Sequence, residues 1–527
     1  MRGPRVRHAR SGAEFQAVNE ATTRVSEIPA PSGGWNAVGN IANMPATDAL
    51  VMDNLFPGVN TVQLRLGSAT RSTGFANNVH CLMPYNGLTT QKLFAACSDG
   101  IYDATTPGVV GAAATACTNG NYVSCMTATP GGTFLVAVNG VDNLKLFDGT
   151  TWNTITGVST PAITGVNTNT FKHVSVFKHR LWLVPQNSLT LYYLDVDSIG
   201  GIAHPFPMNS LFKHGGYLVA TGDWTLDSGN GSDDYFAVCT SEGELALYQG
   251  TDPSSATTWA LIGVYDVGKP IGNRPFIDYG GDLLYLCNNG LLPLSRLTQS
   301  VIIDRSQQTS FKIDGAFLDA TSQFSGNYGW QPIIYKEANF LLVNIPVQND
   351  TVSYQYVMNT ITKSWCRFLG WNASCFATVS GKLYFGAGKT ICQAWTGTSD
   401  SGQPISAVCA QAYNPLGGGG QKHVQMARAN FGVSAAAIVT MAFDADYKAF
   451  QGSTNILYNS LVTAAVWDTS LWNQSIWDPG LQPVEPKWSA VPSDLGYKHS
   501  LRIQITTSTA AFQWNSVNVA TQPAGIL

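Results

Sequence analysis

TFLVAVNGVDNLKLFDG (133–149) places two short apolar runs on either side of a polar turn built on Gly and Asn. Six further stretches follow the same plan: KLFAACSDGIYDA (92–104), RLWLVPQNSLTLYYLDV (180–196), YFAVCTSEGELALY (235–248), LLYLCNNGLLPL (283–294), FLLVNIPVQNDTVSYQYV (340–357) and KLYFGAGKTICQAW (382–395). Successive turns lie roughly 40 to 60 residues apart, and a repeat of that length with several strands per unit is typical of a β-propeller. We therefore predict an all-β protein with a β-propeller of six or seven blades.

The segments on either side of the repeat have a different character. Residues 1–34 lack periodicity and include the linker-like IPAPSGG, which predicts an extended N-terminal arm. Residues 35–396 are expected to form the propeller, with a strand at Thr61–Leu66 that closes the last blade from the N-terminal side. Residues 397–527 contain strand patterns around a glycine loop and predict an additional C-terminal β-sandwich-like domain.

The composition is that of a neutral, β-rich protein. Charged residues make up only 12% of the chain, so we expect part of its surface to be covered by other subunits. The formal net charge of −4 gives no general reason to bind nucleic acid or membranes. The ten cysteines include no CxxC pair and lie mostly in apolar runs, which favours buried, reduced thiols. Because there is no signal-peptide core and no apolar stretch of membrane-spanning length, we expect a soluble protein.

The tip of the N-terminal arm is the only dense basic cluster, made by Arg2, Arg5, Arg7 and Arg10. One interpretation is a solvated tail. The other is an arm that becomes ordered on a neighbouring subunit or on the phosphates of DNA. The sequence leaves both open.

A second candidate contact segment lies in the C-terminal part, in VWDTSLWNQSIWD (466–478). Its tryptophans, Trp467, Trp472 and Trp477, are five residues apart, a spacing that fits neither a strand nor a helix. Core packing and an intersubunit contact are the two interpretations of these aromatic side chains.

No motif in the chain predicts a catalytic residue, a bound cofactor or a resident metal. The histidines have no metal-ligand spacing, and PLGGGGQKH (415–423) lacks the register of a phosphate-binding loop. The loop LDSGNGSDD (226–234) could offer Asp227, Asn230, Asp233 and Asp234 to calcium, but solvated turn residues are the preferred interpretation. We predict that the protein is not an enzyme.

FDGTTW (147–152) resembles the Asp-box turns of propellers. In such a turn Asp148 would cap the loop and Trp152 would pack between blades, which is a structural role. Propellers with Asp-boxes also include glycosidases, for which Glu242 and Glu337 would be the candidate carboxylates in this chain. Arginines and glutamates are sparse in the repeat, so an enzyme or lectin of this kind is the weaker alternative.

Several longer phrases resemble the propeller-bearing tail tube or nozzle proteins (tail tubular B-like) of short-tailed bacteriophages. They are GWNAVGNIANMPATDALVMDNLFP (34–57) with QLRLG (63–67), FKHRLWLVPQNSLTLYYLDVDSIGG (177–201), residues 215–272, and the ending WNSVNVATQPAGIL (514–527). The likeness covers most of residues 34–395 and, more faintly, the C-terminus. It carries over no functional residue, because the function of that family resides in shape.

The resemblance implies a structural virion protein of a short phage tail, assembled in the host cytoplasm. It implies a homo-oligomeric ring, typically of six subunits, attached below the head–tail connector or adaptor protein and meeting tail fibre or tail-tip proteins. Such a nozzle continues the DNA channel, retains the genome and conducts it at ejection, with the DNA passing non-specifically through the lumen. The alternative is another propeller that acts as an interaction scaffold, viral or cellular.

Overall fold

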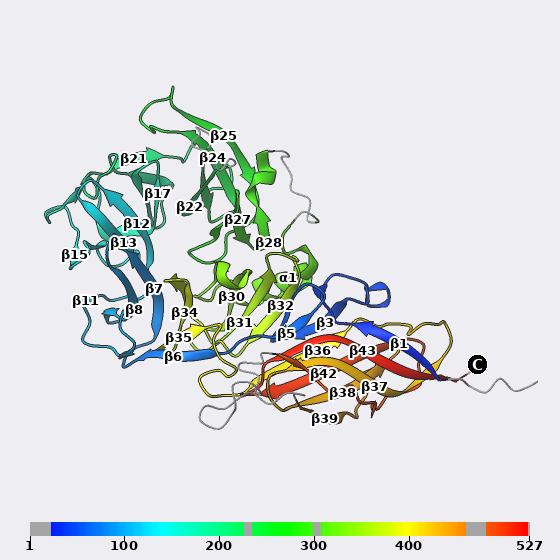
Figure 1. Cartoon of the computed structure of the whole chain (residues 1–527). Helices are drawn as coiled ribbons and strands as arrows, with labels where there is room; N and C mark the ends of the chain where they lie inside the picture. Colours follow the sequence, from blue (N-terminus) through cyan, green and yellow to red (C-terminus); the bar gives the residue numbers. More distant parts are fainter. Residues whose placement is uncertain (1–22, 226–233, 299–305, 307, 460–480, 525–527) are drawn as a thin grey trace, which may run out of the picture.

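The computed structural model describes residues 23–225, 234–298, 306, 308–459 and 481–524, and it is all-β (Figure 1). A ring of seven small sheets forms a β-propeller, and an elongated β-sandwich lies against one side of the ring. The innermost strand of each blade contacts that of the next, and the seventh contacts the first. The ring is therefore closed, and the predicted propeller fold is confirmed.

Blades 1 to 4 are regular four-stranded antiparallel sheets, and within each of them the chain runs from the innermost strand outward. Blade 1 contains β7 (Val79–Asn86), β8 (Gln91–Cys97), β9 (Gly100–Asp103) and β11 (Thr115–Ala116), and blade 2 contains β12 (Val123–Thr129), β13 (Gly132–Val138), β14 (Lys145–Phe147) and β15 (Trp152–Thr154). Blade 3 contains β17 (Phe171–Phe177), β18 (Arg180–Pro185), β19 (Thr190–Tyr193) and β21 (His204–Pro207), and blade 4 contains β22 (Leu218–Thr225), β23 (Asp234–Thr240), β24 (Glu244–Gly250) and β25 (Trp259–Asp266).

Blades 5 to 7 depart from this plan. Blade 5 has three strands: β26 (Phe276–Tyr279), β27 (Asp282–Cys287) and β28 (Gly290–Pro293). Blade 6 contains β29 (Gln331–Tyr335), β30 (Phe340–Gln348), β31 (Val352–Asn359) and β32 (Trp365–Leu369). Blade 7 contains β33 (Cys375–Val379), β34 (Lys382–Ala387), β35 (Thr390–Ala394) and, from the N-terminal side, β6 (Ser68–Thr73), with β10 (Gly108–Val109) pairing parallel to β6.

Each of the seven repeated phrases forms the second and third strands of one blade. These strands are apolar along most of their length because each blade is covered on both faces by its neighbours. Five consecutive residues of β13 and of β23 are buried for this reason. Cysteines within such strands, including Cys239 and Cys287, are buried free thiols, and none of the ten cysteines forms a disulfide.

The strand that closes the ring differs from the expected one. Blade 7 is completed by β6, whereas the segment predicted to close it, Thr61–Leu66, contains β5 (Val62–Leu64). That strand pairs with β4 (Leu55–Pro57) and with a C-terminal strand of the sandwich. Closure from the N-terminal side was predicted correctly and its residues were wrong, because TVQLRL (61–66) has the clearer apolar alternation while the closing strand, SATRST, is mostly polar.

The sandwich is built from both ends of the chain. One sheet contains β1 (Arg24–Pro29), β4, β5, β37 (Lys422–Val433), β40 (Gln482–Pro483), β41 (Ser489–Ala490) and β43 (Phe512–Pro523). The other joins β2 (Gly34–Trp35) and β3 (Asp48–Asp53) to β36 (Ile405–Gln411), β38 (Ala437–Ala445), β39 (Thr454–Tyr458) and β42 (His499–Thr507). The segment 24–64, expected as arm and propeller, thus pairs with strands beyond residue 400.

Propeller and sandwich share one continuous sheet of ten strands. Its path runs from β29 to β32 of blade 6, through β3, and on to β36, β42, β38 and β39. One hydrophobic core follows it, from Phe340 and Phe368 in blade 6 to Phe431 and Trp514 in the sandwich. The two parts therefore lack the exposed linker that separates mobile domains.

Ion pairs lie along this junction. Arg65, whose side chain is fully buried, binds Asp400 through two nitrogens at 2.6 and 3.0 Å. Arg367 on β32 binds Asp53 on β3 at 2.7 and 2.8 Å. Bidentate arginine–carboxylate pairs fix orientation as well as distance, so Arg367 and Asp53 hold blade 6 in register with β3 of the sandwich. Arg65 and Asp400 join the segment after β5 to the segment between blade 7 and β36.

Short elements complete the chain. Helix α1 (Asp314–Phe324) packs between blades 5 and 6 against β28 and β30. Parallel strands β16 (Ile163–Thr164) and β20 (Gly201–Ile202) pair beside blade 3. The short 3₁₀ turns are η1 (Ile41–Asn43), η2 (Thr168–Thr170), η3 (Leu294–Thr298), η5 (Phe311–Ile313) and η6 (Lys336–Ala338).

The Asp-box-like turn has the predicted structural role. Both carboxylate oxygens of Asp148 accept hydrogen bonds from within the turn, among them the backbone N–H groups of Thr150 (2.8 Å) and Thr151 (2.7 Å). These bonds outweigh the partial burial of the carboxylate and hold the pKa of Asp148 well below its usual range. Trp152 packs edge-on against Phe94 of blade 1, with ring centres 5.0 Å apart.

Candidate functional site in the propeller channel

The mouth of the central channel is a hollow of about 410 Å³. It lies where innermost strands begin, because the residues around it include Lys172 at the start of β17 and Leu218 at the start of β22. Asn273 and Tyr328, from the connections before β26 and β29, belong to its polar lining. We call this hollow the channel mouth.

Arg274 reaches from one side of the ring to the other beside the channel mouth. The residue belongs to blade 5, just before β26, yet its Nη2 donates to the carbonyl oxygen of Tyr122 (2.5 Å), between blades 1 and 2. The same nitrogen lies 2.7 Å from the sulfur of Cys81 on β7. The space around this guanidinium is only about 10 Å³, close to the minimum for one water molecule. Arg274 therefore connects blade 5 directly to the nearly opposite blades 1 and 2.

A buried histidine lies near this guanidinium. His173 on β17 is 93% buried, since 7% of its surface is exposed, and its Nδ1 has no hydrogen-bond partner. Its pKa falls to about 3, chiefly because burial disfavours the charged imidazolium and additionally because Arg274 repels it. The imidazole is therefore neutral at physiological pH.

His173 is expected to make the protein sensitive to mild acid. Its pKa is about 3 when folded and near 6.5 when unfolded, so the unfolded chain takes up the proton first. Stability contributed by the neutral form is complete above pH ~6.5 and is lost as pH falls towards 3, at up to about 1.4 kcal/mol per pH unit. A His173→Gln variant should show a flatter loss of unfolding free energy between pH 7 and 4, measured by urea denaturation.

His179, whose side chain is largely exposed, provides the matched control. The His179→Gln variant should retain the pH slope of the wild type. Equal slopes for the wild type and His173→Gln would contradict the assignment of this sensitivity to His173.

Carboxylates occupy the inner strands further from the channel mouth. Asp223 lies on β22 and Asp278 on β26. Desolvation, then repulsion by Asp278 and Asp234, raises the pKa of Asp223 to about 7, although Lys178 opposes the shift. Partial desolvation by the surrounding strands also raises the pKa of Asp278, whose surface is still partly exposed. The channel is thus electrostatically asymmetric, with cations where the strands begin and carboxylates further along.

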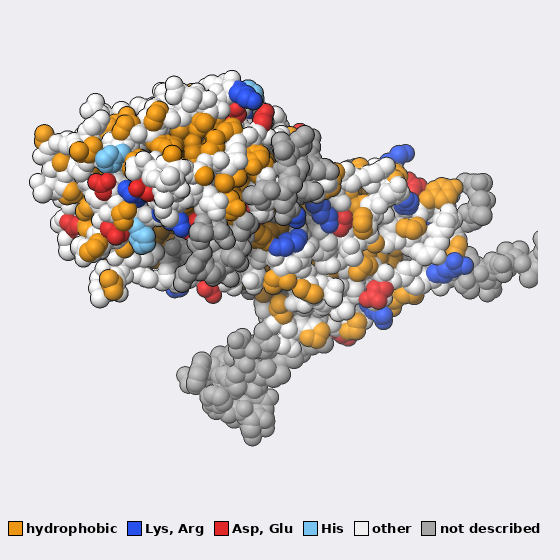
Figure 2. All heavy atoms as spheres, turned by 90° about the horizontal axis from the view of Figure 1, so that it is seen from above, with side chains coloured by type: hydrophobic (Ala, Val, Ile, Leu, Met, Phe, Trp, Pro, Cys, Tyr) orange, Lys and Arg blue, Asp and Glu red, His pale blue; other side chains and the backbone are white. Residues whose placement is uncertain are grey.

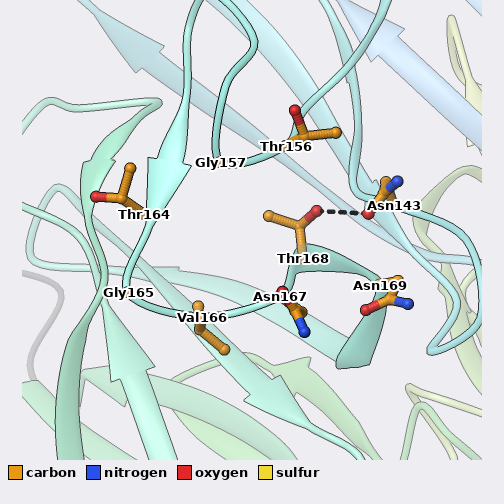
Figure 3. A pocket seen from close by; sticks show the side chains of 9 residues that line it. All are labelled: Asn143, Thr156, Gly157, Thr164, Gly165, Val166, Asn167, Thr168 and Asn169. Atoms are coloured by element: carbon orange, nitrogen blue, oxygen red, sulfur yellow. Dashed lines mark hydrogen bonds between the residues drawn. The ribbon is translucent and has the colours of Figure 1, made fainter.

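A second hollow, of about 810 Å³, lies outside the channel, beside the connection from blade 2 to blade 3 (Figure 3). Amide, hydroxyl and backbone groups line it, with no charged or aromatic side chain. Within it the hydroxyl of Thr168 lies 3.0 Å from Oδ1 of Asn143, and the side chains of Asn167 and Asn169 are exposed (Figure 3). This hollow can form neutral hydrogen bonds, but its lining offers no acid or base.

Most residues singled out from the sequence lie outside the described part of the chain. Arg2, Arg5, Arg7, Arg10, Trp467, Trp472 and Trp477 all lie outside the described residues, as do Asp227, Asn230 and Asp233 of the candidate calcium loop. Asp234, the remaining member of that loop, forms an ion pair with Lys178.

The two candidate glycosidase carboxylates belong to different blades. Glu242 precedes β24 in blade 4 and binds Lys269 at 2.7 Å, and Glu337 lies in η6 of blade 6. In the described part of the chain, no group of three His, Cys, Asp or Glu residues is placed to hold a metal ion. Among the described helices, none is both long and apolar enough to cross a membrane.

Sequence reasoning missed the channel residues Arg274 and His173. Neither lies in a motif, and the groups that Arg274 contacts are 152 and 193 residues away in sequence. A weak signal existed: Arg274 is one of few arginines in the repeat, in a short stretch just before a strand.

No family model and no curated protein matches the sequence. Solved structures with some likeness include the β-propeller domain of Myceliophteria thermophila Cps50 (Swd1), which is 13% identical and has a TM-score of 0.40 over 63% of this chain and 100% of that one. BBS1N, solved in complex with ARL6DN, is 10% identical with a TM-score of 0.37, over 63% of this chain and 97% of that one. Chaetomium thermophilum Raptor is 9% identical with a TM-score of 0.36, over 63% of this chain and 29% of that one. The fold assignment rests on the chain's own ring of blades, and these neighbours assign neither an activity nor a partner to it.

Proposed function

We propose that this protein is a non-enzymatic structural scaffold that assembles with further copies of itself. The observation that carries the proposal is the uncovered outer strand of blade 4, β25. It is eight residues long, pairs only with β24, and exposes three consecutive apolar side chains, Ala260, Leu261 and Ile262. A long apolar edge strand without proline or lysine is a template for pairing with another chain. A β-bulge at Ile262 interrupts its ladder with β24 but leaves the apolar side chains exposed.

The other outer strands are protected in the ways that isolated propellers use. Strands β11 and β15 have two and three residues, and β21 carries prolines at positions 205 and 207. Strand β28 has four residues and ends in Pro293, β32 continues into the sandwich through β3, and β6 is flanked by β10. Hydrophobic side chains also gather on the propeller surface seen from above (Figure 2). A partner would thus bury the most apolar surface and form the most strand-pairing hydrogen bonds at the edge of blade 4.

The continuous sheet between propeller and sandwich supports the same proposal. A subunit in an assembly must transmit orientation from one contact to another, and a shared sheet with bidentate ion pairs does so without a hinge. The charge fraction of 12% also leaves the surface weakly protected against association.

The most specific form of the proposal is a nozzle subunit of a short phage tail. The phrases at 34–67, 177–201 and 215–272, which resemble that family, support it. In this form the chain is part of the virion tail, forms a ring of six, meets the connector above and tail-tip proteins below, and lines a path for DNA. Electron micrographs of the purified assembly should then contain rings with a central hole.

The scaffold proposal predicts that a charge on the blade 4 edge disperses the assembly. In sedimentation velocity the wild type should form oligomers, and Ile262→Lys should raise the dissociation constant at least tenfold, because a lysine ammonium opposes strand pairing. Val158→Lys is the matched control, since Val158 is 94% exposed in a loop of another blade. A wild type that stays monomeric at all concentrations, or equal effects of the two variants, would contradict the proposal.

A further inference from the structure

Arg274 is a cation whose contacts are all neutral. Burial raises the pKa of the Cys81 thiol although Arg274 lies beside it, so the sulfur does not supply a negative charge. Burial likewise raises the pKa of Tyr328, and Tyr122 offers only its carbonyl oxygen. The guanidinium therefore lies inside the ring without a compensating charge from any group that it contacts.

Other arginines within the fold are neutralised directly. Arg65, Arg367 and Arg502 each have an aspartate oxygen within 3.3 Å. For Arg274 no aspartate or glutamate of the described residues lies within salt-bridge distance. Asp350, a carboxylate near Tyr328, lies 3.7 Å from Nδ1 of His80. Arg274 is half-buried, so its charge is partly desolvated, and an anion that reaches it would supply the counter-charge that no described carboxylate provides.

The channel mouth is large enough for an anion, whereas the space around the Arg274 guanidinium is not. Asn273 and Tyr328 line both this hollow and the narrow space around Arg274, so the two adjoin. Lys172 adds a second cation to the lining, and Asn273 adds an amide. A volume of about 410 Å³ is more than ten times the roughly 30 Å³ that one water occupies in the liquid. The mouth can thus hold a small polyatomic anion.

We propose that the channel mouth binds one small oxyanion, a phosphate or a carboxylate, at Lys172 and Asn273 and beside the guanidinium of Arg274 in the adjoining space. Guanidinium groups bind both through paired N–H···O hydrogen bonds. Bound there, the anion would link blades 1, 3 and 5 through one charge, and the site is independent of the edge-strand assembly proposed above.

Calorimetric titration of the full chain with sodium phosphate and, separately, sodium succinate tests this proposal at constant ionic strength. We expect saturable binding to one site for at least one of the two anions. Binding of phosphate alone would identify a phosphate site, and binding of succinate alone a carboxylate site. Arg274→Gln should weaken the affinity at least tenfold and Lys172→Gln several-fold. Lys382→Gln, which changes an exposed lysine of blade 7, should leave it unchanged.

Asn273→Asp keeps the test valid if Arg274→Gln fails to fold. This nearly isosteric change places a carboxylate next to the guanidinium, so it should abolish anion binding and raise the thermal midpoint in anion-free buffer. Saturable binding that survives in Asn273→Asp or Arg274→Gln would overturn the proposal, as would the absence of saturable binding of both anions to the wild type.

Discussion

Replacing Arg65 by methionine is expected to lower the free energy of unfolding by about 3–5 kcal/mol, the loss typical of breaking a buried ion pair from one side. Arg65 donates to Asn54 (2.8 Å), to both oxygens of Asp400, and to the backbone oxygens of Leu66 (2.9 Å) and Leu369 (2.6 Å). Its guanidinium also stacks over Trp371, 4.8 Å from the ring centre. Methionine fills the volume but leaves these acceptors without a donor.

Urea denaturation of the variant measures this loss, and two further variants identify its cause. Arg65→Lys keeps the charge without the bidentate geometry, so it should recover only part of the stability. The double variant Arg65→Met/Asp400→Asn should lose less than the sum of the single changes, because the aspartate no longer remains as an unpaired charge. Strict additivity would show that the pair does not stabilise the junction.

The repeat made the propeller predictable because its cause is local. Strands covered on both faces must be apolar along their length, and that requirement recurs once per blade as a phrase such as TFLVAVN (133–139). The turn at Asp148 was predictable for a similar reason, since all its hydrogen-bond donors lie within five residues. Local physical requirements leave local sequence patterns.

The sandwich was only partly predictable because its pairing is non-local. Strands β1 and β43 lie almost 500 residues apart in sequence, and Arg24 is opposite Thr521. Nothing in the short stretch RVSEIP (24–29) identifies that partner, so its pattern predicts an arm. The same reason explains the misplaced closing strand, because nothing within β5 or β6 identifies the distant edge with which each pairs.

The channel site was not predictable from spacing at all. Arg274 and Lys172 are about a hundred residues apart, and only closure of the ring brings them to adjoining spaces. Motif searches detect chemistry that lies within a few residues. A site built from one residue per blade leaves no such signature, so in closed rings the channel must be inspected in three dimensions.

The second large effect is expected at the aromatic stack between blades 3 and 4. Trp182 on β18 is 1% exposed, and its ring stacks on Trp259 of β25 at 5.5 Å and lies 4.6 Å from Phe236 of β23. Trp182→Ala should lower the free energy of unfolding by about 3–5 kcal/mol, because the change removes a large apolar surface and leaves a cavity that strands on both sides cannot fill. The thermal midpoint and urea denaturation measure the loss.

Trp182→Phe separates packing from specific contacts. Phenylalanine keeps the aromatic stack but loses volume and the indole N–H, which donates to the carbonyl of Phe177 at 3.3 Å. We expect it to cost distinctly less than the alanine change, since a smaller cavity forms and the rings still meet. Leu88→Ala, at a side chain that is 94% exposed, should change stability by less than about 0.5 kcal/mol. If Trp182→Ala lost no more than this surface control, blades 3 and 4 would not depend on the stack, and the integrity of the ring would have to come from its other inter-blade cores.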